Sequence, residues 1–400
     1  MYKTDILIVG GGVIGISIAW EIKKRYKDSS VTLIEKEAQC AEHTSGRNSG
    51  VLHAGFYNTA DSLKAAFSRD GNRELTEYCE AQKIAINKCG KLVVARNQKD
   101  LAGLDELFNR AKANSVLLEN ITADEARSVE PRAITFKRAL FSPTTSSVNP
   151  LQVVQSLERE AQREGVEFHY QVRYLGRKDN RVITSSGDYQ AGYVVNAAGL
   201  YADQVAQDFG FSKHYRILPF KGLYLYSNEP VGSFRTNIYP VPDLSRPFLG
   251  VHFTLGLDNK IKIGPTAIPA FWREHYNGFD NFQFKEFVEI VYRELGLLTF
   301  SNFGFRSLAF EELHKYSRKY MVSLAARLAS NIRIGDYTKW GKPGIRAQLI
   351  DIRNRKLEMD FVIEGDNHSM HVLNAVSPAF TCCLPFSRYV CDQIQDKLNS

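Results

Sequence analysis

Three glycines near the start of the chain constrain its fold more than any other feature. Gly10, Gly12 and Gly15 form the pattern G-x-G-x-x-G. The pattern follows an apolar run, Asp5 to Val9, and opens Val13 to Tyr26, whose apolar residues recur at helical spacing. The first glycine permits a tight turn, the second lets a pyrophosphate approach the backbone, and the third lets helix and strand pack closely. This combination predicts a β-α-β unit that binds a dinucleotide at the N-terminus of the helix.

An acidic residue strengthens this prediction. Glu35 follows a second apolar run, Val31 to Ile34, and lies 20 residues after Gly15. A carboxylate at this place accepts hydrogen bonds from ribose hydroxyls and repels a 2′-phosphate, which disfavours NADP. Because the chain holds one such glycine pattern, separate flavin and nicotinamide domains are not expected.

Composition and charge exclude several classes of protein. Of the 400 residues, 44% are hydrophobic and 24% are charged, which is typical of a globular protein and not of a disordered one. The net charge of +7 comes from scattered basic residues. We therefore expect no nucleic-acid partner, whereas an anionic substrate or weak contact with acidic lipid agrees with the surplus.

Cysteine spacing and hydropathy indicate in which cellular compartment the protein is expected. No CxxC pair occurs among the six cysteines, so we expect free thiols in a reducing compartment. The longest uncharged run, Ile6 to Trp20, is shorter than the ~20 apolar residues that cross a bilayer. The sequence predicts a cytoplasmic protein, with peripheral contact with the inner membrane as an alternative.

Hydrophobic periodicity outlines the remaining elements. Helices are predicted over 62–79, 99–114, 151–164, 282–297, 311–325 and 384–397. Strands are predicted over 90–95, 167–172, 182–185, 193–196, 223–227, 247–254, 260–264 and 371–375. Alternation in the β-rich middle indicates an antiparallel sheet with one covered face. With no linker in the sequence, we expect two interleaved domains: 1–85, 150–215 and 335–400 to bind the nucleotide, and 86–149 and 216–334 to build the substrate region.

Two segments rich in small residues favour FAD over NAD. Thr44 to Gly50 contains several small and hydroxyl residues, which suit a loop around a pyrophosphate and a flavin ring. Val194 to Gly199 reads as a strand that ends on small residues, where a backbone can pass close to a cofactor. A plain Gly/Ser loop is the alternative for both.

Six longer stretches are more specific than the glycine pattern. They are Asn48 to Tyr57, Asn196 to Asp203, Tyr239 to Asp243, Pro247 to Thr254, Gly344 to Gln348 and Ser377 to Ala379. Through them the chain resembles, nearly end to end, the L-2-hydroxyglutarate dehydrogenase/oxidase family of the D-amino-acid-oxidase-like superfamily. The resemblance implies an α/β fold, in which a Rossmann-like domain binds FAD non-covalently and an interleaved substrate domain is built on an antiparallel sheet plus helices. It also implies oxidation of L-2-hydroxyglutarate to 2-oxoglutarate, with electrons passed to a quinone or to oxygen.

The glycine pattern, the small-residue segments and the resemblance together nominate the cofactor-binding residues. They are Gly10, Gly12, Gly15, Glu35, Lys36, Thr44, Ser45, Asn48, Ser49, Gly50, Val172, Ala198, Gly199, Gly344, Ser377, Pro378, Ala379 and Thr381. Cys382 and Cys383 follow the last of these and replace small or hydroxyl residues of the family. Covalent attachment of the flavin through either thiol is the lesser alternative.

Oxidation of a 2-hydroxy acid needs a base for the hydroxyl proton and cations for the carboxylates. His53 is the first candidate base, because an imidazole titrates near neutral pH and related glycerol-3-phosphate oxidases look similar at this histidine. His252 is its competitor. Arg346 is the candidate carboxylate clamp, since guanidinium binds carboxylate through two parallel hydrogen bonds. Lys221 stands where the family usually shows arginine, and it is the candidate second cation.

Tyr57 and Tyr239 are candidate hydroxyl donors to the substrate. Arg47 departs from the histidine that is common in the family. Two other functions stay open: an FAD-dependent enzyme acting on glycerol 3-phosphate, another 2-hydroxy acid or an amino acid, and a flavin-bound interaction protein without turnover.

Overall fold

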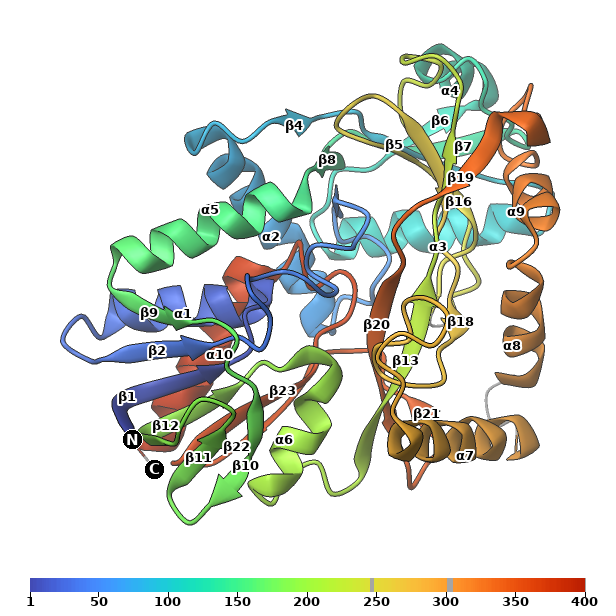
Figure 1. The fold of residues 1–400 in the computed structure, drawn as a ribbon. Coiled ribbons are helices and arrows are strands. Elements are labelled where there is room, and N and C mark those ends of the chain that lie inside the picture. Colours follow the sequence, from blue (N-terminus) through green and yellow to red (C-terminus); the bar gives the residue numbers. More distant parts are fainter. Residues whose placement is uncertain (245–247, 301–304, 400) are drawn as a thin grey trace. The chain divides into compact units, whose positions relative to one another are not determined.

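The computed structural model describes residues 1–244, 248–300 and 305–399. The chain forms two compact units, and Figure 1 labels their helices and strands. Unit 1 contains 1–48, 150–219 and 346–400, and unit 2 contains 49–149 and 220–345. The units differ from the predicted domains most at 49–85, which belongs to unit 2. The reason is local pairing: β3 (Val51–Leu52) and β4 (Ile86–Asn87) both pair with β8 (Ser146–Val148).

Unit 1 is built on a mixed sheet whose centre is parallel. Strand β1 (Tyr2–Val9) lies between β2 (Val31–Ile34) and β12 (Tyr189–Asn196). On the outer sides, β2 pairs with β9 (Val166–His169) and β12 pairs with β23 (Ser369–Asn374). All of these pairs are parallel. The antiparallel strands are β10 (Tyr174–Lys178), β11 (Arg181–Thr184) and β22 (Val362–Gly365). Because the central strands are parallel, their carboxyl ends lie along one edge of the sheet.

Helices bury the sheet of unit 1. Helix α1 (Val13–Arg25) contacts β1, β2 and β9, and it packs against α5 (Pro150–Arg163) and α10 (Cys383–Leu398). The short helix α6 (Ala202–Asp208) contacts β10, β12 and β23. The buried face of α1 is almost entirely apolar, from Val13 to Ile22, as expected for a helix covered on several sides.

Unit 2 contains an eight-stranded sheet in the order β19-β14-β17-β16-β15-β5-β7-β6. The strands are β5 (Lys91–Val94), β6 (Glu119–Thr122), β7 (Arg138–Ser142), β14 (Leu225–Ser227), β15 (Asn237–Pro240), β16 (His252–Leu255), β17 (Ile261–Gly264) and β19 (Tyr337–Trp340). The predicted antiparallel sheet needs one correction, because β5 and β15 pair in parallel. They are neighbours although about 140 residues separate them, which periodicity cannot reveal.

Both faces of this sheet are covered within unit 2. One face packs on α4 (Ala123–Val129) and α9 (Arg318–Ala325) through a core that includes Leu92, Ile238 and Phe253. The opposite face packs on α3 (Asp100–Ala113) through Val93, Leu104 and Leu107. The other helices are α2 (Leu63–Ala81), α7 (Phe284–Phe300) and α8 (Phe305–His314).

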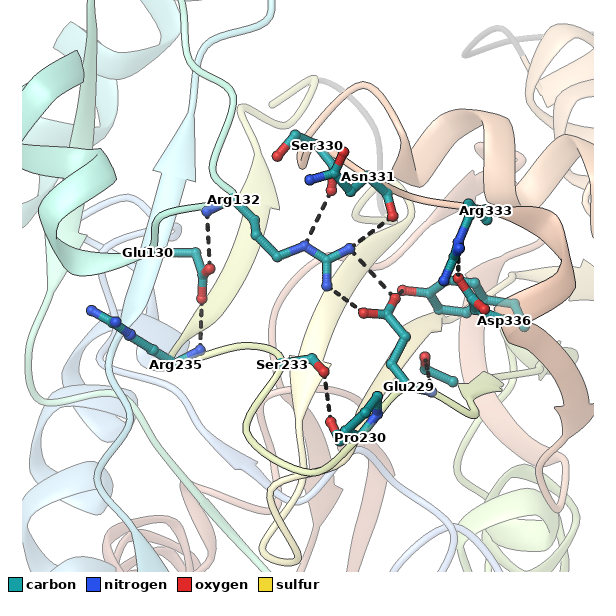
Figure 2. Close-up of polar contacts among 12 residues, drawn as sticks. Glu130, Arg132, Glu229, Pro230, Ser233, Arg235, Ser330, Asn331, Arg333 and Asp336 are labelled. Atoms are coloured by element: carbon teal, nitrogen blue, oxygen red, sulfur yellow. Dashed lines mark hydrogen bonds and ion pairs between the residues drawn. The ribbon is translucent and has the colours of Figure 1, made fainter.

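A polar cluster joins three loops of unit 2 beside this sheet. Figure 2 shows the Arg132 guanidinium, which pairs with Glu229 and donates to the carbonyls of Ser330 and Asn331 at 3.1 Å each. The neighbouring carboxylate of Glu130 accepts from the backbone N–H groups of residues 132 and 235. The cluster therefore ties loops that are distant in the sequence.

Two strands carry the chain from one unit to the other. They are β13 (Tyr215–Gly222) and β20 (Gly344–Asp351), because the division falls after Pro219 and after Ile345. Both belong to a four-stranded sheet in the order β18-β13-β20-β21, completed by β18 (Ile268–Pro269) and β21 (Lys356–Leu357).

Two other element predictions were wrong. The predicted helix over 311–325 is two helices, α8 and α9, since Ser317 adopts an extended conformation and its Oγ accepts from the N–H of Tyr320, which starts a new helix. The predicted strand over 247–254 begins at His252, and Pro247 lies outside the described residues. Within the part of the chain that the structure describes, no helix has the length and apolarity to cross a bilayer.

Candidate active site

The glycine turn of unit 1 has no room for side chains. Gly10 has a φ of +112°, and a Cβ there would lie 2.6 Å from the carbonyl oxygen of Ala197. A Cβ on Gly15 would lie 2.0 Å from the carbonyl oxygen of Gly10. Both positions therefore require glycine, the first for its backbone conformation and the second for the close packing of α1 on the turn. Gly12 is the N-cap of α1, where the first N–H groups have no partner within the helix.

Glu35 is fixed at the end of β2. Its side chain is buried, its Oε2 accepts from the N–H of Gly11 at 2.7 Å, and its Oε1 accepts from the N–H of Glu37 at 2.9 Å. A carboxylate oxygen can accept more than one hydrogen bond. The carboxylate is thus held beside the glycine turn, and its binding of ribose hydroxyls stays a prediction.

The segment after Glu35 folds onto the start of α1. The Oγ of Ser45 accepts from the N–H of Val13 at 2.9 Å, and the N–H of Ala41 donates to the carbonyl of Gly11. The amide of Asn48 donates to the carbonyl of Ser45 at 2.7 Å. Thr44 lies in the same turn. The segment thus lies against the glycine turn, and its wrapping of a pyrophosphate and a flavin ring stays a prediction.

Further predicted residues lie along the same edge of the sheet. In the register of the parallel strands, Val9 is opposite both Ile34 and Asn196, so the strand ends are level. The N–H of Val172 donates to the carbonyl of Glu35 at 2.9 Å. Ala198 and Gly199 lie just after the end of β12. Lys36 lies just after the end of β2, and its amine pairs with the carboxylate of Glu37.

The C-terminal candidates also belong to unit 1. Ser377, Pro378, Ala379 and Thr381 connect β23 to α10, and the peptide bond before Pro378 is cis. Cys382 is the N-cap of α10 and Cys383 is its first residue, and both are fully buried. The segment is thus held by a helix that packs on α1.

These observations fit an adenine dinucleotide. The turn excludes side chains, the helix start supplies backbone donors, and a fixed carboxylate lies within hydrogen-bond reach of the turn. Bound at this edge, a dinucleotide would be held by Gly10, Gly12 and Gly15 at its pyrophosphate and by Glu35 at its ribose.

Two substrate candidates of unit 2, Tyr239 and His252, lie on one face of its large sheet. His252 begins β16, and its ring stacks on that of Tyr239 in β15, with ring centroids 3.7 Å apart. Its Nδ1 lies 2.8 Å from the carbonyl of Gly250, so Nδ1 carries the proton and Nε2 is the acceptor. Burial, with repulsion from nearby lysines, lowers the pKa of His252 to about 3. The ring is therefore neutral at neutral pH.

The remaining candidates of unit 2 lie on its loops and connecting strands. Ser49 and Gly50 precede β3 and His53 follows it, half-buried; Tyr57 stands near Phe56, with ring centroids 4.4 Å apart. Lys221 is buried in β13, and burial lowers its pKa to about 8. In β20, Gly344 belongs to unit 2 and the half-buried Arg346 belongs to unit 1.

Sequence reasoning missed two buried lysines on the same sheet face. Lys91 is fully buried in β5, and Lys262 in β17 donates to the carbonyl of Ser49 at 3.2 Å. Burial lowers the pKa of Lys91 to about 7 and that of Lys262 to about 8. The available signal was a lysine within each of two otherwise apolar strands, K-L-V-V and I-K-I-G.

Comparison with known proteins decides the family. Residues 5–392 match the family described as DAO, FAD dependent oxidoreductase. The chain belongs to this family. The prediction of an FAD-dependent oxidoreductase is confirmed, and FAD is its cofactor.

This FAD-dependent oxidoreductase is similar in sequence to L-2-hydroxyglutarate dehydrogenases from bacteria and mammals. It is 33% identical to L-2-hydroxyglutarate dehydrogenase of Escherichia coli (strain K12), over 99% of this chain and 94% of that protein. It is 35% identical to the mitochondrial L-2-hydroxyglutarate dehydrogenase of Bos taurus, over 98% of this chain and 89% of that protein.

Among solved structures, the FAD-bound L-alpha-glycerophosphate oxidase from Mycoplasma pneumoniae is similar with a TM-score of 0.77 and 21% identity. That match covers 99% of this chain and 95% of the oxidase. It confirms the predicted α/β fold of the oxidoreductase and, at this identity, carries nothing about its substrate.

Proposed function

We propose that the protein oxidises L-2-hydroxyglutarate to 2-oxoglutarate and passes the electrons to a quinone or to oxygen. The observation that carries the proposal is its similarity to two L-2-hydroxyglutarate dehydrogenases over nearly their whole length. The buried amines of unit 2 suit a substrate with two carboxylates.

The residues of the chain divide the work as follows. His53 accepts the proton of the substrate hydroxyl, because the pKa of His252 near 3 makes that ring a poor acceptor at neutral pH. Arg346 binds the carboxylate next to the reacting carbon, and Lys221 adds a second positive charge. Tyr57 and Tyr239 orient the substrate. FAD supplies the two-electron acceptor when it is bound, and we propose that it is held without a covalent bond.

Anaerobic mixing of the purified, FAD-loaded protein with L-2-hydroxyglutarate tests the proposal. We expect the flavin absorbance near 450 nm to bleach, at about neutral pH, within the time of one turnover. D-2-hydroxyglutarate is the matched control and should leave the absorbance unchanged. Bleaching by glycerol 3-phosphate, another 2-hydroxy acid or an amino acid in place of L-2-hydroxyglutarate would contradict the proposed substrate, and a flavin inert to all of them would indicate a protein without turnover.

The electron acceptor is part of the same proposal. Admission of a soluble quinone or of oxygen to the reduced protein should restore the flavin absorbance, and the faster of the two is the better acceptor. Transfer of electrons to a quinone agrees with a protein that contacts a membrane peripherally from the cytoplasmic side. Cosedimentation of the protein with acidic vesicles tests that contact.

A further inference from the structure

Lys91 carries a buried amine that lacks a polar partner. The side chain is fully buried, and among the residues that the structure describes its Nζ has no hydrogen-bond partner. Three aromatic rings surround it instead: the Nζ lies 4.8 Å from the ring centroid of Phe56, 4.7 Å from that of Tyr57 and 4.8 Å from that of Tyr239. Ring faces attract a cation but do not replace the hydrogen bonds of water.

The sheet register places other polar groups on the same side as Lys91. Lys91 is opposite Asn237 of β15, and Tyr239, two residues further on, points to that side and stacks on His252. Across β16, Thr254 is opposite Lys262 of β17. The amines of Lys91 and Lys262 both act on His252, whose pKa they help to lower. The sheet face therefore brings two buried amines to one side.

Among the residues that the structure describes, no carboxylate forms an ion pair with either amine. Lys262 donates to a backbone carbonyl, and its nearest acidic influence is Asp258 at the turn before β17. By comparison, Lys315, a third buried lysine whose charge acts on His252, is paired with the carboxylate of Glu312. A buried amine is costly unless an anion meets it, and an apolar side chain such as methionine would fill the same space at no such cost.

The rings of Phe56, Tyr57 and Tyr239 form an aromatic box around the Lys91 amine, and the Tyr57 side of this box is partly exposed. The hydroxyl of Tyr57 is buried and has no hydrogen-bond partner among the described residues, while the residue as a whole is half-buried. Tyr57 is thus the wall of the box that solvent reaches, and a ligand that met Lys91 from that side would also find the hydroxyl.

We propose that Lys91 binds the carboxylate of the substrate that lies farther from the reacting carbon, with the hydroxyl of Tyr57 as a second donor. The reacting end of a hydroxy acid needs a base and several donors, whereas a box of ring faces around one amine suits a methylene chain that ends in a carboxylate. This inference rests on the proposed function, because it requires a substrate with two carboxylates.

Binding of two unreactive acids to the FAD-loaded protein tests the inference. Glutarate keeps both carboxylates, pentanoate keeps one, and either should perturb the flavin absorbance without reducing it. We expect wild type to bind glutarate more tightly than pentanoate. Lys91→Met should raise the Kd of glutarate on the order of 10- to 100-fold and leave that of pentanoate within about twofold, because one charged hydrogen bond is lost.

Two further variants separate binding from folding. Lys91→Gln keeps a polar head without the charge and should reproduce the loss of glutarate affinity. Lys88→Met removes an exposed lysine that pairs with Glu80, and it should leave both affinities unchanged. Equal weakening of the two acids, unchanged glutarate binding, or failure of both Lys91 variants to take up FAD would each overturn the inference.

The outcome for Lys91 is distinguishable from that for the proposed reaction. Selective loss of glutarate binding in a protein that L-2-hydroxyglutarate does not reduce would retain the carboxylate site and reject the proposed substrate. Reduction by L-2-hydroxyglutarate with no selective loss would retain the substrate and reject the role of Lys91.

Discussion

At the scale of single residues, environment decides which histidine can act as a base. His252 is buried, has its Nδ1 proton committed to a carbonyl, and has a pKa lowered to about 3. A catalytic base works best when its pKa lies near the working pH, so His252 suits orientation better than proton transfer. His53 is half-buried on the loop after β3.

Substitution of the two histidines separates these roles. His53→Ala should slow bleaching of the flavin by L-2-hydroxyglutarate by about 100-fold or more, because the hydroxyl proton loses its acceptor. Stopped-flow absorbance of single turnovers measures this rate. His214→Ala changes an exposed histidine and should leave the rate unchanged. An unchanged rate in His53→Ala with a loss in His252→Ala would transfer the role to His252.

Single residues also show where sequence reasoning stops. Glu35 was predictable because the pattern that identifies it is local, with a fixed spacing after the glycines. The significance of Lys91 was not, because a lysine at the start of a strand is normally exposed, and only the arrival of Phe56, Tyr57 and Tyr239 from other segments buries it.

At the scale of elements, the loops around Arg132 are held by few but buried contacts. The side chain of Arg132 is 16% exposed and that of Glu229 is 10% exposed. The guanidinium also lies over the ring of Phe234, 4.3 Å from its centroid. Loss of one partner leaves the other charge buried without a counterion, which is more costly than loss of a surface pair.

Arg132→Met should therefore lower the free energy of unfolding by about 3 kcal/mol or more, measured by urea denaturation. Arg127→Met removes an exposed ion pair with Asp124 and is the control, with an expected change of at most about 1 kcal/mol. The double variant Arg132→Met, Glu229→Leu should recover part of the loss. Equal stability of Arg132→Met and wild type would show that the loops do not depend on this cluster.

Elements differ in how well the sequence predicts them. Helices α1, α3 and α5 begin and end within a residue or so of the prediction, since periodicity and flanking residues act locally. The break before α9 depends on one serine side chain, and the parallel pairing of β5 with β15 depends on contacts between distant segments. Apolar periodicity contains neither kind of information.

At the scale of the whole molecule, FAD should stabilise the fold because it binds the folded chain. Removal of FAD should lower the Tm, and FAD at about 100 times its Kd should restore about 2.7 kcal/mol of stability. Gly15→Ala should abolish this restoration, since its Cβ would lie 2.0 Å from a backbone oxygen.

The control for that substitution is Gly176→Ala in β10, where a Cβ meets no atom within 4 Å. It should respond to FAD as wild type does. Differential scanning fluorimetry with and without FAD compares the three proteins, and full restoration of Gly15→Ala by FAD would contradict the assignment of the turn.

The interleaving of the two units has a consequence for synthesis on the ribosome. The eight-stranded sheet of unit 2 has all of its strands once Trp340 has emerged, whereas β12 of unit 1 still lacks its neighbour β23, and α1 still lacks α10. The glycine turn is among the first residues translated. Its supporting sheet and helix layer are therefore complete only after nearly the last residues have been translated. A nascent chain stalled before residue 369 should accordingly fail to retain the flavin.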